Sequence, residues 1–109
     1  SSKVEYEKVG NINFYMDNLG ETDSGEVQKL VRKITSKEDN LAAFGFSKGS
    51  KASVILASSN SLSINCGSIL KEALSSVGGS GGGKDSYAQG ACSVDGVSAV
   101  LLKIKELIA

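Results

Sequence analysis

The first 20 residues alternate between apolar and polar positions, which is the period of a β-strand with one buried face. Apolar residues stand on both sides of Gly10-Asn11: Val4 and Tyr6 before it, and Ile12, Phe14 and Met16 after it. A tight turn between two alternating segments predicts a β-hairpin. We expect its second strand to fade at residues 17–20, where the pattern is lost.

A helical period follows. Thr22-Asp23-Ser24 are good capping residues, and Glu26 would lie in the first turn. Every third or fourth residue is then apolar, at Val27, Leu30, Val31 and Ile34. This spacing predicts a helix with one buried stripe. Lys29, Arg32 and Lys33 cover much of its other side, either as a basic patch or as an ordinary solvated face.

Two strands are predicted next, over residues 41–46 and 52–57. The second of them, Val54-Ile55-Leu56-Ala57, is apolar without interruption, which is typical of a central strand. Five residues, 47–51, join the two strands and favour a second antiparallel hairpin. The helix before residue 41 also permits a parallel pairing across it.

The second half of the chain predicts two more helices with a short strand between them. The first is capped by Asn65 or Ser68 and ends at Gly78, the usual position of a helix C-terminal glycine. Residues 87–92 are small enough for a close backbone approach and predict an edge strand. The last helix begins near residues 93–95. The two buried stripes are Ile69, Leu70, Ala73, Leu74 and Val77, and Val97, Val100, Leu101, Ile104, Leu107 and Ile108.

These elements predict an α+β (mixed α/β) fold: a mostly antiparallel mixed sheet of about five strands, backed by three helices. A length of 109 residues fits one domain, residues 1–109. Because the sequence does not begin with methionine, we expect it to be a fragment of a longer chain.

The amino-acid composition limits which kinds of functional site this chain can contain. The 12 basic and 12 acidic side chains give a formal net charge of zero, so nucleic-acid contact would need a local site rather than a basic surface. Histidine is absent, which removes the commonest general base and the usual zinc ligand. The carboxylates are scattered. We therefore expect no catalytic residue, metal or cofactor in this chain.

Compartment is indicated by two features. No apolar run approaches the roughly 20 residues that cross a bilayer, and no signal-peptide pattern opens the chain. Cys66 and Cys92 are too few for a disulfide framework, so we expect reduced, half-buried thiols. A cytoplasmic protein without membrane contact is predicted. Cys66 near a helix N-terminus has two readings, a thiol of lowered pKa or an inert one.

Gly78-Gly79-Ser80-Gly81-Gly82-Gly83-Lys84 holds five of the 13 glycines in seven positions. Peptide N–H groups without side chains can face an anion, and a lysine adds a positive charge beside them. The alternative is a flexible linker or a loose turn after a helix. The glycines would also let the chain pass close to the sheet.

The capped helix, the Gly-Gly-x-Gly-Gly-Gly-Lys run and Tyr87-Ala88-Gln89-Gly90 together resemble the DHHA1 domain of the C-terminal region of alanyl-tRNA synthetase. The resemblance covers about the whole chain, and the glycine motif with Ala-Gln-Gly is its specific part. Asp85 and Ser86 stand where the family commonly has Pro and Asp.

The resemblance implies a tRNA-binding module that helps position alanine-specific tRNA for aminoacylation and editing. It implies no catalysis by this fragment, but a parent chain that is an alanine-tRNA ligase. Its partners would be the tRNA, the catalytic and editing domains of that chain, and a second copy in a homodimer. The predicted contact residues are Gly81, Gly82, Gly83, Lys84, Tyr87, Gln89, Gly90, Asn65 and Gly67.

Several of these residues have a structural alternative. Asn65 and Gly67 fit a helix cap and a tight helix entry as well as a phosphate site. Gln89 would bond a base or sugar, or else loop backbone groups; Tyr87 would stack on a base, or else be buried.

Two other functions stay open. Related DHHA1 domains end DHH phosphoesterases, where histidine usually follows the glycine triplet and the domain helps bind a nucleotide; others end stand-alone alanyl-tRNA editing proteins. Lys84 favours the synthetase or editing branch. A pure dimerisation module is the remaining alternative.

Overall fold

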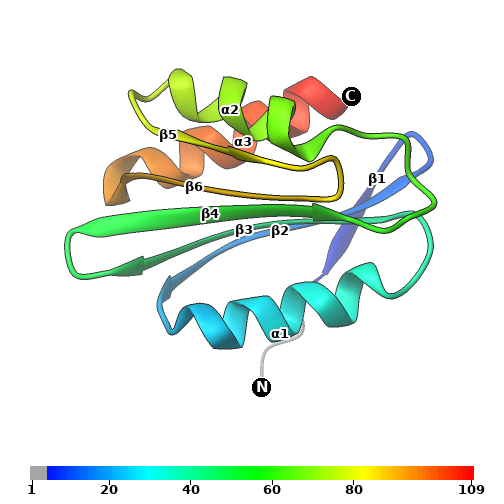
Figure 1. The fold of residues 1–109 in the computed structure, drawn as a ribbon, viewed down its shortest axis with the longest axis horizontal. Helices are drawn as coiled ribbons and strands as arrows, with labels where there is room; N and C mark the ends of the chain where they lie inside the picture. Colours follow the sequence, from blue (N-terminus) through cyan, green and yellow to red (C-terminus); the bar gives the residue numbers. More distant parts are fainter. Residues whose placement is uncertain (1–4) are drawn as a thin grey trace.

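Six strands and three α-helices make up residues 5–109, which are the residues that the computed structural model describes (Figure 1). The predicted fold class, a mixed sheet with three helices, is confirmed. In chain order the elements are β1 (Tyr6–Val9), β2 (Ile12–Glu21), α1 (Ser24–Thr35), β3 (Asn40–Lys48), β4 (Lys51–Ser58), α2 (Cys66–Ser75), β5 (Ser80–Gly83), β6 (Tyr87–Ser93), a 3₁₀ turn (Val94–Gly96) and α3 (Val97–Ile108).

The strands form one sheet in the order β1-β2-β3-β4-β6-β5. Only β2 and β3 are parallel, and α1 connects them, as the strand–helix–strand pattern permits. Both predicted hairpins are confirmed: Val9 pairs with Ile12 across Gly10-Asn11, and Lys48 pairs with Lys51. Val4, which the sequence assigns to the first hairpin, lies outside the described residues.

Three expectations about the strands are wrong. β2 does not fade at residue 17 but continues to Glu21, because its pairing with β3 resumes after a register shift between Asn18 and Glu21. The glycine run is not a loop, since residues 80–83 form strand β5, which pairs with β6 and brings the sheet to six strands. Residues 87–92 therefore do not form an edge strand: β6 lies between β4 and β5, and β5 is the edge.

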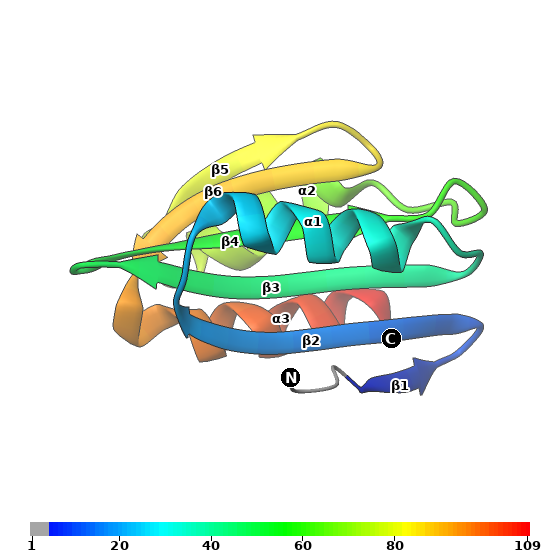
Figure 2. The ribbon, with the colours of Figure 1, turned by 90° about the horizontal axis from the view of Figure 1, so that it is seen from below.

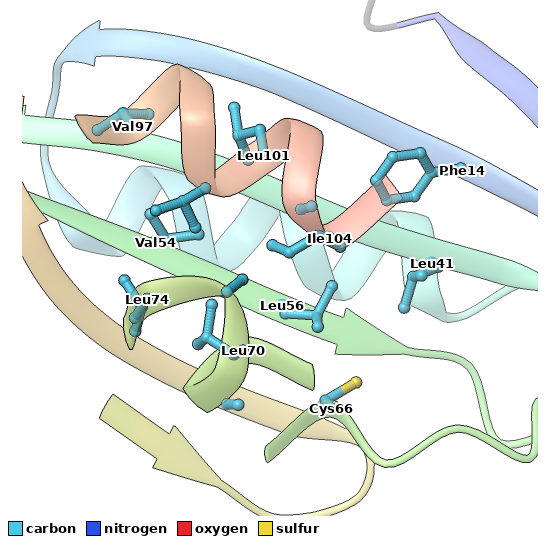
Figure 3. Close-up of a cluster of buried hydrophobic side chains, with 14 of the residues drawn as sticks. Phe14, Leu41, Val54, Leu56, Cys66, Leu70, Leu74, Val97, Leu101 and Ile104 are labelled. Atoms are coloured by element: carbon cyan, nitrogen blue, oxygen red, sulfur yellow. The ribbon is translucent and has the colours of Figure 1, made fainter. Parts of the chain in front are cut away.

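The helices divide between the two faces of the sheet (Figures 1 and 2). Helix α1 covers one face, where Val27, Val31 and Ile34 pack on apolar residues of β3 and β4. Helices α2 and α3 cover the other face, where Leu70, Leu74, Val100, Leu101 and Ile104 build the larger core (Figure 3). Successive residues of β3 and β4 thus serve opposite cores, which explains why both strands are apolar throughout.

The helix ends follow the sequence signals. Asp23 is the N-cap residue of α1, although its side chain forms no capping hydrogen bond; Asn65 caps α2, and its Oδ1 accepts a hydrogen bond from the Ser68 amide at 3.0 Å. After α2 the chain turns at Gly78, whose φ of +74° suits glycine. Of residues 5–109, none lies in a helix with the length and apolarity that crossing a bilayer takes.

Cys66 opens α2 with its thiol in the larger core, fully buried (Figure 3). Burial raises the pKa of this thiol from 9.0 to about 11; a hydrogen bond with Ser58 acts in the opposite direction, and the charge of Asp85 adds to the rise. Position at a helix N-terminus therefore does not activate Cys66. The reading as an inert thiol is confirmed, and Cys92 is half buried with its pKa also raised by burial.

This burial predicts a loss of stability at alkaline pH. Native Cys66 holds its proton more tightly than the unfolded chain does, so its contribution is complete below pH 9 and is lost as the pH rises from 9 toward about 11. The loss should reach about 3 kcal/mol, from roughly 1.4 kcal/mol per pKa unit. Urea unfolding at pH 8, 9, 10 and 11 measures it. The Cys66→Ala variant is the reference for other titrating groups, and parallel curves for the two proteins would contradict the assignment.

Candidate nucleic-acid interface

Most of the predicted contact residues lie on the β5–β6 hairpin, whose turn is Lys84-Asp85-Ser86. Strand register divides them between the two faces of the sheet. Gly81 pairs with Gly90 and Gly83 with Ala88, and Ala88 belongs to the core beneath α2. Gly82 pairs with Gln89, which pairs in turn with Ile55 of the core beneath α1. Alternate residues of a strand face opposite sides, so Gly81, Gly83 and Gly90 face α2, while Gly82 and Gln89 face the side of α1.

The glycines that face α2 have no room for a side chain. A Cβ atom on Gly81 would lie 2.8 Å from the Gln89 carbonyl oxygen and 2.9 Å from Cδ1 of Leu74. One on Gly90 would lie 2.7 Å from the Ser80 carbonyl oxygen, and one on Gly83 would lie 2.6 Å from Cα of Ala88. These separations are shorter than a carbon atom tolerates. The motif therefore lets the two strands of the hairpin and the Leu74 side chain of α2 pack closely together.

The N-terminus of α2 is bonded to the same hairpin. The Cys66 amide donates to the Asp85 carbonyl at 2.8 Å, and the Gly67 amide donates to the Lys84 carbonyl at 3.0 Å. The next two amides, of Ser68 and Ile69, donate to the side chain and the carbonyl of Asn65. The Ile69 bond is the first one within the helix, and the three N–H groups that precede it, those of Cys66, Gly67 and Ser68, all have partners. A phosphate site made by these amides is therefore not available.

Asn65 and Gly67 thus occupy structural positions. Asn65 is the cap, and a Cβ on Gly67 would lie 2.9 Å from the carbonyl carbon of Gly83. Contact of either residue with nucleic acid stays a prediction.

Two glycine N–H groups of β5 point away from β6, toward the edge of the sheet. The Lys84 amide donates to the Tyr87 carbonyl at 2.8 Å, so Lys84 points its N–H toward β6. In an antiparallel ladder this orientation recurs at every second residue, which turns the N–H groups of Gly82 and Ser80 the same way. The N–H groups of Gly81 and Gly83 point away from β6, toward the open edge. The predicted anion cradle thus reduces to these two donors.

The Lys84 side chain is the cation of the hairpin. Lys84 is exposed, and its ammonium forms no ion pair with another residue of the range 5–109. Both its backbone groups are bonded, to Tyr87 and to Gly67, so the base of the side chain is held in place. Asp85 follows it directly, which makes the turn neutral as a whole. Any attraction for a phosphate is therefore short in range.

The face of the hairpin opposite α2 carries Tyr87, Gln89 and Ala91 of β6 with Ser80 and Gly82 of β5; we call it the open face. Helix α1 lies over β3 and β4, and the β5–β6 end of the sheet extends beyond it (Figure 2). Tyr87 is 37% exposed, which does not fit the alternative of a buried aromatic. Gln89 is exposed, and within residues 5–109 its side chain forms no hydrogen bond.

Arg32 is a neighbour of this face; the sequence named it, with Lys29 and Lys33, as part of either a basic patch or a solvated helix face. It lies on the side of α1 that borders β6, and it shares a groove with Tyr87. The charge of Arg32 opposes the rise that burial causes in the Tyr87 pKa. The helical pattern could not place Arg32 beside Tyr87, because its distance from β6 depends on how α1 is placed across the sheet.

In the part of the chain from residue 5 onward, no three Cys, Asp or Glu side chains are grouped so that they could share a metal ion. The arrangement is one of hydrogen-bond donors, a cation and an aromatic ring on an exposed hairpin. These are the groups of a surface that binds an anionic polymer.

Comparisons with known proteins place this domain in a family and find its fold in other structures. Residues 11–109 match the model of the DHHA1 domain, and the chain belongs to that family. No match was found among curated proteins.

Two solved structures share the fold. The C-Ala domain of alanyl-tRNA synthetase from Aquifex aeolicus is 20% identical, with a TM-score of 0.85; the match covers 95% of this chain and 97% of that one. The pGpG-specific phosphodiesterase PggH from Vibrio cholerae is 12% identical, with a TM-score of 0.54. That match covers 95% of this chain but only 35% of PggH.

Because alternate glycines of β5 face α2, we expect alanine substitutions at neighbouring glycines of this strand to have different effects on stability. Gly81→Ala should lower the free energy of unfolding by about 1–3 kcal/mol, the usual cost of overpacking. Gly82→Ala is the matched control, because its Cβ would meet no atom within 4 Å. It should be neutral or slightly stabilising, since alanine loses less backbone entropy than glycine. Denaturant unfolding of both variants provides the measurement, and similar losses in both would show that β5 is not packed in this way.

Proposed function

We propose that this chain is a tRNA-binding C-terminal module of an alanyl-tRNA synthetase, which helps position alanine tRNA for aminoacylation and editing. The observation that carries the proposal is the likeness to the C-Ala domain, which extends over nearly all of both chains. Membership of the DHHA1 family supports it. Catalysis would belong to other domains of a parent chain, and the tRNA would act in the cytoplasm.

The hairpin supplies a physical basis for RNA contact. Lys84 and the outward amides of Gly81 and Gly83 lie at one exposed edge, where they would bond phosphate oxygens. Backbone donors and a single cation contact the sugar–phosphate chain without reading its sequence. Because the net charge is zero, the affinity of this chain alone would be weak, about micromolar or weaker, as for non-specific binding. Linkage to the other domains would raise it.

A nucleotide-binding lobe of a DHH phosphoesterase is the second candidate, because PggH shares the fold. Lys84 occupies the position where that branch usually has histidine, and the lower TM-score also favours the synthetase. A stand-alone alanyl-tRNA editing protein is the third, and its tail would bind the same tRNA. A purely dimerising module would bind no RNA at any salt concentration.

Binding of labelled alanine tRNA to this chain, measured by fluorescence anisotropy at low salt, tests the proposal. Lys84→Ala should weaken binding about fivefold, as expected for the loss of roughly 1 kcal/mol of charge-assisted bonding. The slope of log K against log salt should fall by about 0.7–0.9, because one phosphate contact is lost.

Lys48→Ala is the matched control. Lys48 is an exposed lysine at the turn between β3 and β4, and the register places this turn at the opposite end of the sheet from Tyr87. It should bind tRNA like the unmodified chain. Equal affinities of all three proteins would remove Lys84 from the interface, and absence of binding even at low salt would refute RNA binding itself.

A further inference from the structure

The groove between α1 and β6 is a candidate ligand site apart from the glycine edge. Arg32 and Thr35 of α1, with Ser36 directly after the helix, line one side of it, and Asn60, Ser86 and Tyr87 line the other. Val31 and Ala57, both almost fully buried, contribute the apolar part of its lining. We propose that this groove binds one unpaired nucleotide of an RNA strand, with its base on the Tyr87 ring and its phosphate on Arg32. The inference rests on the proposed function and adds a second contact to it.

Arg32 is the cation of the groove, and it lies in the last turn of α1. No acidic residue lines the groove, and Arg32 forms no ion pair with a carboxylate of residues 5–109. An arginine without a carboxylate partner keeps its planar set of N–H donors for a phosphate. The hydroxyls of Thr35, Ser36 and Ser86 do not all remain free, because Thr35 bonds the Val31 carbonyl and Ser36 bonds the Lys33 carbonyl. The Arg32 guanidinium is therefore the main phosphate donor.

The Tyr87 ring supplies the second half of the site. Tyr87 begins β6 directly after the turn, and its backbone carbonyl is bonded by the Lys84 amide, so its position relative to the hairpin is fixed. Partial burial raises the pKa of its phenol, and the phenol therefore stays uncharged at neutral pH. A neutral ring beside a guanidinium is suited to an aromatic base that carries a phosphate.

The size of the groove limits its occupant to one unit of a strand. Its volume of about 320 Å³ is at the small end of the range for ligand clefts, roughly 300–1,000 Å³. Base stacking on Tyr87 also requires a base that is not already stacked in a helix. The structure therefore favours a loop or a single-stranded segment over duplex RNA. From the groove, such a strand would continue over the open face toward Gln89, which is the next residue of β6 on the same side.

Binding of a fluorescent single-stranded octauridylate tests the groove. Tyr87→Ala should weaken binding by about 5-fold to 100-fold, the range for loss of one base–aromatic stack. Tyr87→Phe should bind within about twofold of the unmodified chain, because it keeps the ring. Arg32→Ala should weaken binding at least fivefold. Lys33→Ala is the matched control, since Lys33 is an exposed cation of the same helix that does not line the groove.

NMR locates the ligand and shows whether each variant is folded. On addition of 5′-uridylate, the backbone amide signals of Thr35, Ser86 and Tyr87 should shift, and inorganic phosphate at equal ionic strength should shift them less. Equal shifts with both ligands would mean that the base is not recognised, and would overturn the inference. So would a Tyr87→Ala variant that remains folded and binds the octamer as well as Lys33→Ala does.

The outcomes separate this inference from the proposed function. Weakened tRNA binding in Lys84→Ala, together with unchanged octamer and tRNA binding in Arg32→Ala and Tyr87→Ala, would refute the groove and leave the proposed function standing. Octamer binding that depends on Arg32 and Tyr87, in a chain that does not bind alanine tRNA, would support the groove and refute the proposed function. Failure to bind either RNA would refute both.

Discussion

The contact between the β5–β6 hairpin and the first turn of α2 is the constraint on which the rest of this structure depends. Gly67 and Gly83 meet with backbone atoms in contact, while Leu74 lies over Gly81 and Gly90. The first two amides of α2 end on the carbonyls of the hairpin turn. Because no side chain separates Gly67 from Gly83, the turn is held against the first turn of the helix. The ammonium of Lys84 projects from a fixed base, not from a mobile loop.

This constraint changes what the glycine motif does. In a flexible loop, every amide of the glycine run could donate a hydrogen bond to an anion. In strand β5, half of these amides donate to β6 instead, and only those of Gly81 and Gly83 point toward the edge of the sheet. The amides at the N-terminus of α2 are also bonded, to carbonyls of the hairpin turn and to Asn65. Recognition therefore moves from the loop backbone toward exposed side chains. Lys84, Tyr87 and Gln89 stand on the hairpin, and Arg32 stands across the groove.

The exposed face of the β5–β6 hairpin is accessible because the three helices are divided unequally between the two faces of the sheet. Helices α2 and α3 together cover the face that holds the larger core, but α1 alone covers the other and packs mainly on β3 and β4 (Figure 2). The end of the sheet that α1 leaves uncovered is built from small and polar residues of β5 and β6. The same uncovered end brings Arg32 beside Tyr87. One side of the β5–β6 hairpin therefore packs against α2, and the other side borders the groove that contains Tyr87.

The sequence by itself determined the helices, the two hairpins and the cap of α2, because periodicity and turn chemistry are local. The stripe of Val27, Val31 and Ile34, the turn at Gly10-Asn11 and the cap at Asn65 all formed as these local signals predict. Only the tertiary structure decided that the glycine run is an edge strand and that residues 87–92 lie inside the sheet. A glycine has no side chain to reveal its neighbour, so its packing against α2 is invisible in the pattern. The approach of Arg32 to Tyr87 was equally hidden, since it joins residues 55 positions apart through the placement of a helix across a sheet.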